Sequence, residues 1–356
     1  MRAFSSIPSR FQVSVVLIYC RTFLTIGCKK EGKLRCQIMQ INEAIKKVIA
    51  SQSLNDAEML SVMRDVMSGR TTDAQNAGFL VGMQIKGPDV VEITAAARVM
   101  RELAVPVSVQ DRSNLLDTCG TGGSGSNTFN ISTASALVAA VAGARVAKHG
   151  NRSASSKSGS ADVLEAAGVS LDLSAAQVAA CVDSIGVGFM FAPAHHSAMK
   201  HVAPARKELG VRTIFNLLGP LTNPARAVNQ VMGVYDSELI EPLVEVLRGL
   251  GARNILVVAA EDGLDEISCS AATHVGELRE GEIFQYIVTP EEFGIKQRKD
   301  YFELQVSSPE ESLKLLKSAL TYSHEGAGDI VALNAGAAIY VANLSSDLAA
   351  GVEQAK

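Results

Sequence analysis

The centre of the chain reads Asp117-Thr-Cys-Gly-Thr-Gly-Gly-Ser-Gly-Ser-Asn-Thr-Phe-Asn-Ile-Ser-Thr133. Leu115 and Leu116 precede it, as at the end of a buried strand, and an apolar helical run from Ala134 to Ala142 follows it. Glycine lets backbone N–H groups approach an anion closely and adopts positive φ without strain. A helix N-terminus adds free N–H donors and a positive dipole end. The order strand, glycine loop and helix therefore predicts a cradle for phosphate or pyrophosphate.

The glycine spacing alone leaves a second interpretation open. The loop lacks the Gly-Lys-Ser/Thr ending of a P-loop, and Gly120-Thr-Gly-Gly-Ser-Gly125 only imitates the dinucleotide fingerprint. A plain turn between a strand and a helix would use glycines in the same way.

The bulk composition is that of a globular protein. The chain has 356 residues, enough for one large or two smaller domains, with 47% hydrophobic and 20% charged residues. A net charge of −4 argues against nucleic-acid binding. None of the six cysteines forms a C-x-x-C pair, so neither zinc nor a redox pair is indicated, and we expect a reduced chain in the cytoplasm.

The N-terminal extension, residues 1–38, is unusual. Its first 30 residues carry basic residues and no acid, which is typical of a targeting segment. Its apolar runs are too short to span a bilayer, so no membrane partner is expected. The alternative is a start codon assigned too early, with Met39 as the natural first residue. We favour the second interpretation because an amphipathic helix begins directly after Met39.

Residues 39–110 have helical periodicity and are predicted to form a small all-helical domain. One face of its first helix is predicted to carry Ile41, Ile45, Val48 and Ile49. Thr72 and Gln75 form a capping-box pattern at the start of a later helix. The last helix is expected to begin at Pro88, with Val91 on its apolar face. Stripes of methionine in these helices are interpreted as core packing.

Residues 111–356 alternate between strand-like and helical runs. The expected strands are Leu115–Thr118, Ala144–Lys148 and Asn254–Ala260, and the expected helices include Ser132–Ala142 and Ala161–Ala167. This pattern predicts an α/β domain with a mostly parallel central sheet flanked by helices. Ligands in such sheets bind beyond the C-terminal ends of the strands, so loops starting at Gly120, Lys148 and Glu261 are expected to converge.

Two further segments of this domain have sequence patterns that allow a structural prediction. Residues 194–210 are predicted to form a helical segment that lines the cleft, and it carries His195, His196 and His201. Three nearby histidines could bind a metal, but no paired carboxylate pattern accompanies them, so a cleft-lining helix is the favoured interpretation. Phe215 to Pro224, with its glycine and prolines, is predicted to be a loop.

Several long motifs occur in one order: Gly120-Thr-Gly-Gly, Asn130-Ile-Ser-Thr133, Lys148-His-Gly-Asn-Arg152, Gly159-Ser-Ala-Asp162 and Asn216-Leu-Leu-Gly-Pro-Leu-Thr-Asn-Pro224. On these motifs the chain resembles the anthranilate phosphoribosyltransferases of tryptophan biosynthesis, from about Met39 to the C-terminus. The resemblance implies a homodimer formed through the helical domain, with no nucleic-acid or membrane partner. It also implies transfer of the phosphoribosyl group of 5-phosphoribosyl 1-diphosphate to the amine of anthranilate, with release of diphosphate.

The resemblance also assigns a substrate-binding set. Its members are Gly120, Gly123, Ser124, Thr128, Asn130, Ile131, Ser132, Thr133, Lys148, His149, Gly150, Asn151, Arg152, Ser155, Ser156, Ser160 and Arg206. Lys148 and Arg152 supply fixed positive charge for phosphate oxygens, although alone they could be exposed cations of a surface loop. Arg206 is implied to grip the carboxylate of anthranilate, and an arginine on a helix surface is the alternative. Lys148, Asn151 and Arg206 are expected to act by electrostatics and positioning.

Asp265 and Glu266 form an adjacent acidic pair after a strand. Two neighbouring carboxylates repel each other unless a divalent cation neutralises them, and an acidic surface turn is the alternative. By resemblance this pair binds Mg²⁺ together with the hydroxyl of Ser132. Ser124 departs from the family, which usually has aspartate there, and we predict surviving activity with weaker binding of phosphoribosyl diphosphate.

Two other functions are compatible with parts of this pattern. A pyrimidine nucleoside phosphorylase would share the architecture, but the motifs at Lys148–Arg152 and Asn216–Pro224 argue against it. A non-catalytic relative that binds nucleic acid should lose the acidic pair and gain basic surface, whereas Asp265, Glu266 and Arg206 are present here.

Overall fold

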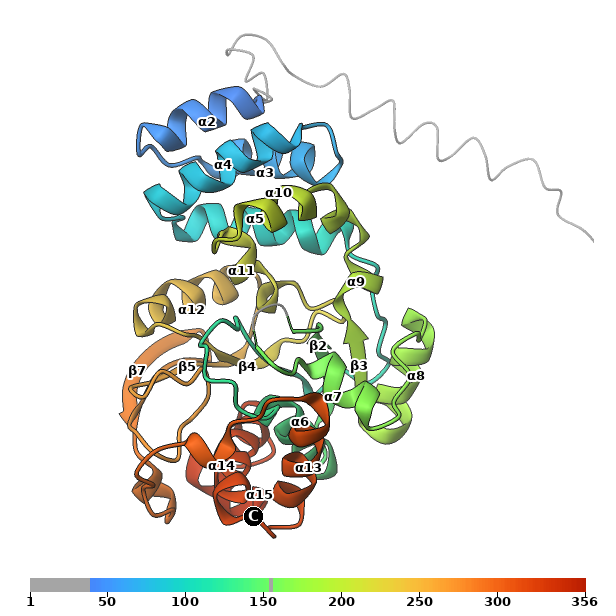
Figure 1. The fold of residues 1–356 in the computed structure, drawn as a ribbon, viewed down its shortest axis with the longest axis vertical. Helices are drawn as coiled ribbons and strands as arrows, with labels where there is room; N and C mark the ends of the chain where they lie inside the picture. The colour runs from blue at the N-terminus through green and yellow to red at the C-terminus, as the bar shows by residue number, and fades with distance from the viewer. Residues whose placement is uncertain (1–38, 154–155) are drawn as a thin grey trace, which may run out of the picture. The chain divides into compact units, whose positions relative to one another are not determined.

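The computed structural model describes residues 39–153 and 156–356, so the predictions for residues 1–38 and for Ser155 lie outside the described part. The chain begins with four helices: α2 (Ile41–Ile49), α3 (Asp56–Met67), α4 (Asp73–Lys86) and α5 (Val90–Leu103) (Figure 1). The predicted capping box of Thr72 with Gln75 opens α4. The last helix begins after Asp89, which caps it, and not at Pro88.

The apolar faces of these helices agree with the prediction except at two positions. Ile41 and Val48 are buried, as are the methionines of the predicted stripes: Met59, Met63, Met67, Met83 and Met100. Ile49 and Val91 were predicted to share the buried faces, but they are 69% and 48% exposed. Each lies at the end of its helix, where the neighbouring helices do not cover it.

The rest of the chain is built on a seven-stranded sheet. The strands are β1 (Leu115–Gly120), β2 (Arg145–Gly150), β3 (Val187–Phe191), β4 (Asn229–Gly233), β5 (Asn254–Ala260), β6 (Thr273–Arg279) and β7 (Glu282–Val288). Their order is β3-β2-β1-β4-β5-β6-β7, with the first five parallel and the last two antiparallel. The predicted mostly parallel sheet is therefore confirmed.

Strand β5 shows why the sheet is covered on both faces. Because side chains alternate along a strand, Ile255 and Val257 enter one hydrophobic core and Leu256 and Val258 enter another. The first core includes α12 (Ile240–Gly249) and helices α2–α5, and the second includes α6 (Ile131–Val141) and α14 (Glu325–Val341). The helical segment 39–103 therefore packs into the same core as one face of the sheet.

The remaining helices connect and cover these strands (Figure 1). They are α7 (Ser160–Ala166), α8 (Ala175–Ile185), α9 (Ala192–His195), η1 (Ser197–His201), α10 (Ala203–Leu209), α11 (Ile214–Leu218), η2 (Pro220–Thr222), η3 (Ser237–Leu239), η4 (Pro290–Phe293), η5 (Phe302–Leu304), α13 (Pro309–Leu320) and α15 (Leu348–Ala355). No helix in the described ranges is long and apolar enough to cross a membrane.

Two segments differ from the sequence prediction. Residues 194–209 do not form one helix but the three short pieces α9, η1 and α10, since His196 leaves helical φ/ψ and Pro204 opens α10 without an N–H. The predicted loop from Phe215 to Pro224 contains α11 and η2. At the start of α11 the side-chain oxygen of Asn216 accepts from the backbone N–H of Thr213 at 3.0 Å, which is one half of a capping box.

Candidate active site

The glycine loop connects β1 to α6, in the predicted order of strand, loop and helix. Gly122, Gly123 and Gly125 have φ values of 65°, 82° and 72°. L-residues with a side chain rarely adopt this left-handed region, so glycine is required there. The loop at the C-terminal end of β1 therefore has a backbone conformation that depends on its glycines.

Asp265 lies against the last residues of two neighbouring strands, next to this loop. Gly120 of β1 pairs with Gly233 of β4. A Cβ atom on Gly233 would lie 1.7 Å from the carbonyl oxygen of Asp265, and one on Gly120 would lie 2.9 Å from its Oδ2 atom. Two glycines in register thus allow the acidic pair to reach the glycine loop.

These residues enclose a small polar cavity, which we call the loop cavity. It is lined by Gly120, Gly122, Gly123, Ser124, Gly125, Ser126, Asn127, Thr128, Phe129, Asn130, Ile131, Ser132, Ser156, Asp265 and Glu266. The structure therefore brings the glycines and hydroxyl groups of this loop next to two carboxylates from a distant part of the chain. Asp265 lies 145 residues after Gly120 in the sequence.

Both carboxylates at the loop cavity are half-buried and disfavour their charged forms. Burial, followed by repulsion from Asp265, raises the pKa of Glu266 to about 8. Burial also raises the pKa of Asp265, which is countered by hydrogen bonds from Ser124 and from the backbone of Gly122. The charge of Lys148 opposes this rise at Glu266 only in part. Two adjacent carboxylates in this environment are a charge that a divalent cation would neutralise.

Lys148 approaches the loop cavity through Ser132. Its Nζ atom lies 3.2 Å from the Oγ atom of Ser132 and donates to the carbonyl oxygen of Thr118. Burial lowers the pKa of Lys148, whereas the neighbouring charge of Asp117 raises it. Lys148 is thus a buried cation held at the base of the first turn of α6.

Asp117 is the buried counter-charge of Lys148 and is itself held by two donors. The side-chain amide of Asn223 donates to its Oδ2 atom at 2.6 Å, and the backbone N–H of His149 donates to its Oδ1 atom at 3.1 Å. Burial nevertheless raises the pKa of Asp117. The network ties η2 to β1 and β2 beneath the site.

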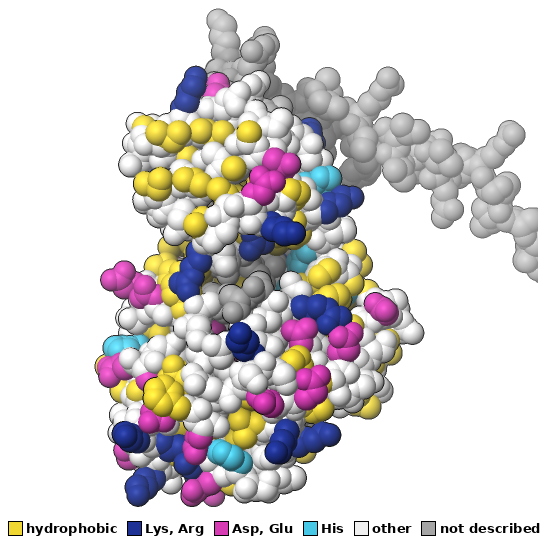
Figure 2. Space-filling model, viewed as in Figure 1, with side chains coloured by type: hydrophobic (Ala, Val, Ile, Leu, Met, Phe, Trp, Pro, Cys, Tyr) yellow, Lys and Arg dark blue, Asp and Glu magenta, His cyan; other side chains and the backbone are white. Residues whose placement is uncertain are grey.

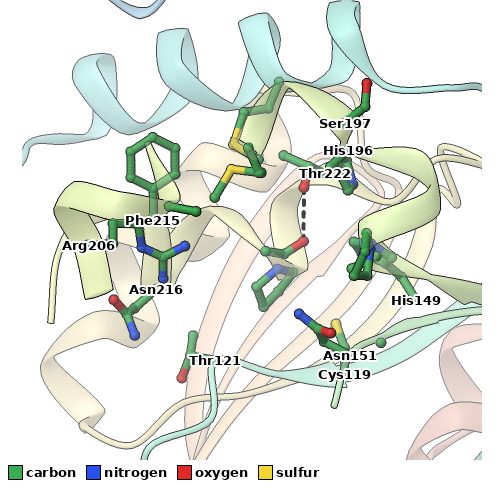
Figure 3. Close-up of a pocket in the computed structure, with 18 of the residues that line it drawn as sticks. Cys119, Thr121, His149, Asn151, His196, Ser197, Arg206, Phe215, Asn216 and Thr222 are labelled. Atoms are coloured by element: carbon green, nitrogen blue, oxygen red, sulfur yellow. Dashed lines mark hydrogen bonds between the residues drawn. The ribbon is translucent and has the colours of Figure 1, made fainter. Parts of the chain in front are cut away.

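A second, larger cavity of about 590 Å³ adjoins the first at Gly120, and we call it the histidine cavity. Its volume suits a small molecule. It is lined by Met100, Cys119, Gly120, Thr121, His149, Gly150, Asn151, Ala192, Pro193, His196, Ser197, Met199, Lys200, Ala203, Arg206, Phe215, Asn216, Gly219, Pro220 and Thr222. Figure 3 shows Arg206 and Asn216 on one side of this cavity and His149 and His196 on the other.

The two histidines of this cavity are neutral at physiological pH. Their ring centroids are 5.0 Å apart, and the Nε2 atom of each is buried without a hydrogen-bond partner in the described ranges. Burial, and then each ring's histidine neighbours, lowers the pKa of His149 to about 3 and that of His196 to about 4. Positive charge in the cavity therefore comes from lysine and arginine.

Arg206 is such a cation. Its guanidinium carbon lies 5.4 Å from the centroid of the Phe215 ring. Burial lowers its pKa, and no carboxylate lies within 4.0 Å of it in the part of the chain that the structure describes. Arg206 thus lines the cavity beside an aromatic ring, an arrangement that can bind a carboxylate.

Several members of the predicted set lie elsewhere. The guanidinium of Arg152 pairs with Glu165 at 2.7 and 2.9 Å and does not line either cavity. Thr133 is buried with an unpaired hydroxyl, and Ser160 donates to the carbonyl of Asn151 at 3.4 Å. The side chain of Asn130 turns away toward Ser158 and Ser312, although its residue lines the loop cavity.

Sequence reasoning missed three residues that shape the site: Asp117, Asn223 and Arg212. Arg212 donates through Nη2 to the carbonyl of Gly123, and its guanidinium lies 3.7 Å from the centroid of the Tyr235 ring. Asp117 could have been noticed as a charge inside an apolar strand. Nothing in the sequence pattern singles out Arg212, because its partners are far away in the chain.

The donor set at the loop cavity fits Mg²⁺. Oxygen atoms of Asp265, Glu266 and Ser132 suit this ion, and Mg²⁺ usually takes its other ligands from water and substrate phosphates. A group of three or more His, Cys, Asp or Glu side chains with metal-binding geometry does not occur within residues 39–153 and 156–356. Two carboxylates and one hydroxyl would leave the remaining ligand positions of such an ion to water or substrate oxygens.

Two family models match the chain. The model described as "Glycosyl transferase family, a/b domain" matches residues 112–356, and the one described as "Glycosyl transferase family, helical bundle domain" matches residues 42–104. Together they cover most of the described chain.

Two similar proteins are anthranilate phosphoribosyltransferases from bacteria. The anthranilate phosphoribosyltransferase of Cellvibrio japonicus is 58% identical over 322 residues, which are 89% of this chain and 93% of the relative. That of Hydrogenovibrio crunogenus is 55% identical over 318 residues, 89% of this chain and 93% of the relative.

Among solved structures, anthranilate phosphoribosyltransferase (TrpD) from Thermus thermophilus is 46% identical with a TM-score of 0.82, covering 88% of this chain and 93% of that one. The Saccharomyces cerevisiae enzyme in complex with PRPP and Mg shares the fold at 24% identity, with a TM-score of 0.80 and coverage of 88% and 92%. The chain therefore belongs to the anthranilate phosphoribosyltransferase family.

Proposed function

We propose that the chain performs the reaction of its family with the residues of the two adjoining cavities. The phosphoribosyl group of 5-phosphoribosyl 1-diphosphate is transferred to the amine of anthranilate in L-tryptophan biosynthesis. The products are N-(5-phosphoribosyl)anthranilate and diphosphate. The observation that carries this proposal is that the loop cavity and the histidine cavity meet at Gly120, so that an anionic donor and an aromatic acceptor can lie in contact.

The loop cavity is the proposed site of the donor. N–H groups of the glycine loop and of the N-terminus of α6 hydrogen-bond to the diphosphate oxygens, with hydroxyls of Ser124, Thr128 and Ser156 beside them. Lys148 adds a buried positive charge from beneath Ser132. Arg152 is exposed enough to leave Glu165 for a substrate phosphate, since such a surface pair contributes only about 0–1 kcal/mol.

The histidine cavity is the proposed site of anthranilate. Arg206 can bind its carboxylate with two parallel hydrogen bonds, while Asn151 and the neutral histidines surround the ring and the amine. A variant of the yeast enzyme, 25% identical to this chain, has been solved in complex with 4-fluoroanthranilate. 4-Fluoroanthranilate is a small aromatic acid of the same type as anthranilate.

Asp265, Glu266 and Ser132 would hold Mg²⁺, which neutralises charge on the diphosphate leaving group when it is bound. The nitrogen of anthranilate forms a bond to C1 of the ribose as the bond from C1 to diphosphate oxygen breaks. The proton of the amine is released to solvent water after bond formation. Since aromatic amines are neutral at working pH, the chain's residues contribute by positioning both substrates and by stabilising the departing charge.

The test is an assay of anthranilate fluorescence, which disappears as the product forms. Loss of fluorescence should require phosphoribosyl diphosphate and Mg²⁺ together. Glu266→Gln should lower activity and raise the Mg²⁺ concentration needed, whereas Glu261→Gln, which removes an exposed acid from the same turn, should not. Purified protein that leaves anthranilate unchanged under these conditions overturns the proposal.

The proposed homodimer has a candidate surface on the helical domain. Ile49 of α2, Ile85 of α4 and Val91 of α5 are 69%, 81% and 48% exposed. Figure 2 shows rows of hydrophobic side chains over these helices. Burial of this surface between two copies would explain its apolar character. Sedimentation analysis of the Ile85→Glu variant tests this, since a monomer is expected.

The cytoplasmic location of the protein stays a prediction from the sequence.

A further inference from the structure

A third cavity, of about 620 Å³, lies apart from the two already described, and we call it the arginine cavity. Helices α3 and α5 form one wall, and the segments at 226–228 and 249–252, which precede β4 and β5, form another. It is therefore at the N-terminal ends of these parallel strands, whereas the glycine loop follows the C-terminal end of β1. Its charged residues are Arg64, Arg98, Arg101, Glu102, Arg112 and Arg226.

The arginines of this cavity are only partly neutralised. Arg64 pairs with Glu102 at 2.9 Å, and Arg98 pairs with Asp56 at 2.7 Å. No carboxylate lies within 4.0 Å of Arg101, Arg112 or Arg226 in residues 39–153 and 156–356. Three uncompensated cations gather here in a chain whose net charge is −4.

Hydrogen bonds to backbone carbonyls hold the guanidinium groups of Arg101 and Arg112 in place. Arg101 donates through Nε to the carbonyl of Leu221 at 2.7 Å and through Nη1 to that of Leu250 at 3.1 Å. Arg112 donates through Nη2 to the carbonyl of Arg226 at 2.9 Å, and Arg226 itself has a φ of 51°. A non-glycine residue in this region of φ is uncommon and points to a local role.

The like charges of Arg101 and Arg226 interact unfavourably. Burial, followed by the charge of Arg226, lowers the pKa of Arg101 to about 10. Their repulsion is relieved when an anion lies between them. A tetrahedral oxyanion with several acceptor oxygens can satisfy guanidinium donors that come from different directions, which a flat carboxylate cannot do as well.

We propose that the arginine cavity binds a dianion of the phosphate class, either inorganic phosphate or a phosphomonoester, between Arg101, Arg112 and Arg226. This site is separate from the donor site of the loop cavity. It nevertheless touches the histidine cavity through the backbone, because Met100 lines that cavity next to Arg101, and Leu221 lies between Pro220 and Thr222, which line it. Arg101 is for that reason unsuitable for a test, and Arg112 and Arg226 are suitable.

The experiment is calorimetric titration of the full-length protein that is already saturated with phosphoribosyl diphosphate and Mg²⁺, so that the donor site is filled. Inorganic phosphate and ribose 5-phosphate are titrated in separate arms, and the tighter arm identifies the natural source. The fluorescence assay on the same sample checks that the donor site is active. The test variant is Arg112→Gln with Arg226→Gln, and the matched control is Arg248→Gln, which removes an exposed arginine outside the cavity.

Wild type and the Arg248→Gln control should bind one phosphate group per chain, and the double variant should bind it at least about tenfold more weakly with unchanged turnover. Arg226→Lys, which keeps the charge but loses the planar donor fork, should fall between them. Absence of phosphate binding in the wild type, or equal binding in the double variant, overturns the proposal. Binding of a polyanion such as an oligonucleotide without binding of either small phosphate also overturns it.

Discussion

The side-chain amide of Asn223 donates a 2.6 Å hydrogen bond to the Oδ2 atom of Asp117, 106 residues earlier in the chain. The same amide donates to the carbonyl oxygen of Ala147 at 2.9 Å, and its oxygen accepts from the backbone N–H of Ala225. Asn223 thus joins β1, β2 and η2 at one buried point. This contact gives a structural role to the motif Asn216–Pro224, for which the sequence indicated no chemistry.

Asn223→Ala should destabilise the fold strongly. The substitution leaves the buried carboxylate of Asp117 and the carbonyl of Ala147 without their donor, and such a loss costs about 2–4 kcal/mol of unfolding free energy. Urea denaturation followed by circular dichroism measures the change. Substitution of the exposed Gln52 by alanine is the control and should change stability by less than about 0.5 kcal/mol. A similarly small effect of Asn223→Ala would contradict the role assigned to it.

The buried histidines should make the protein sensitive to acid. Burial lowers the folded-state pKa of His149 to about 3 and of His196 to about 4, below the unfolded value of about 6.5. The unfolded state therefore binds more protons below pH 6.5, and stability is lost as the pH falls from about 6.5 toward 4. Each histidine contributes a slope of up to about 1.4 kcal/mol per pH unit.

The measurement is the unfolding free energy at several pH values between 6.5 and 5. The variant with His149→Asn and His196→Asn should lose less stability over this range than the wild type, whatever its stability at neutral pH. The single variants should have intermediate slopes. Parallel pH curves for the wild type and the double variant would show that these imidazoles do not stay neutral in the fold.

The sequence was sufficient where the chemistry is local. The glycine loop, the strand before it and the helix after it follow from residues within one short segment, and the structure confirms that order. Thr72 with Gln75 is equally local. The breaks at His196 and Pro204 were missed when residues 194–210 were predicted as one helical segment, although Pro204 offered a signal.

Contacts between residues far apart in the chain could not be predicted from the sequence. Asp265 reaches the glycine loop because Gly120 and Gly233 lie in register, which requires the strand order with β4 next to β1. A pattern of strands and helices does not specify that order. The exposure of Ile49 has the same origin, since a helical face is buried only as far as its neighbours extend.

Arg206 should determine affinity for anthranilate. Loss of a charge-assisted pair of hydrogen bonds in Arg206→Gln is expected to raise the KM for anthranilate roughly 10- to 100-fold, with little change in the KM for phosphoribosyl diphosphate. Arg206→Lys should recover only part of the loss, because lysine lacks the planar fork. Lys207→Gln, on the exposed side of the same helix, is the control. An equal rise in both KM values would argue against a direct contact with the acceptor.

Ser124 should be replaceable by aspartate with a gain in donor binding. The Ser124 hydroxyl hydrogen-bonds to Asp265 and lies 3.0 Å from the Oγ atom of Ser126. A carboxylate at this position adds negative charge beside the acidic pair, which a bound Mg²⁺ would neutralise. At saturating Mg²⁺, Ser124→Asp is expected to lower the KM for phosphoribosyl diphosphate.

The neutral variant Ser124→Asn is the control for size and polarity and should leave that KM close to its wild-type value. Without Mg²⁺, Ser124→Asp should be less stable than Ser124→Asn, because its added charge repels Asp265. A KM that is unchanged in Ser124→Asp would refute the idea that the serine weakens binding of the donor.

Arg212 should set the conformation of the glycine loop. Its Nη2 atom donates to the carbonyl of Gly123, and its guanidinium stacks on the ring of Tyr235 at 3.7 Å, just beyond the end of β4. A cation over an aromatic ring contributes about 0.5–1 kcal/mol at an exposed site, and a charged hydrogen bond adds about 1.5–3 kcal/mol. Arg212→Gln removes both, so the loop loses its link to the sheet.

The expected result is a KM for phosphoribosyl diphosphate that rises about tenfold or more, with the KM for anthranilate nearly unchanged. Tyr235→Phe keeps the ring and should behave as wild type. Tyr235→Leu loses the ring and should raise the KM for phosphoribosyl diphosphate about two- to fivefold. Because Arg212 lies between α10 and α11, a direct contact with the acceptor is the competing explanation. That explanation predicts the opposite split, in which Arg212→Gln raises the KM for anthranilate and Tyr235→Leu leaves the KM for phosphoribosyl diphosphate unaltered.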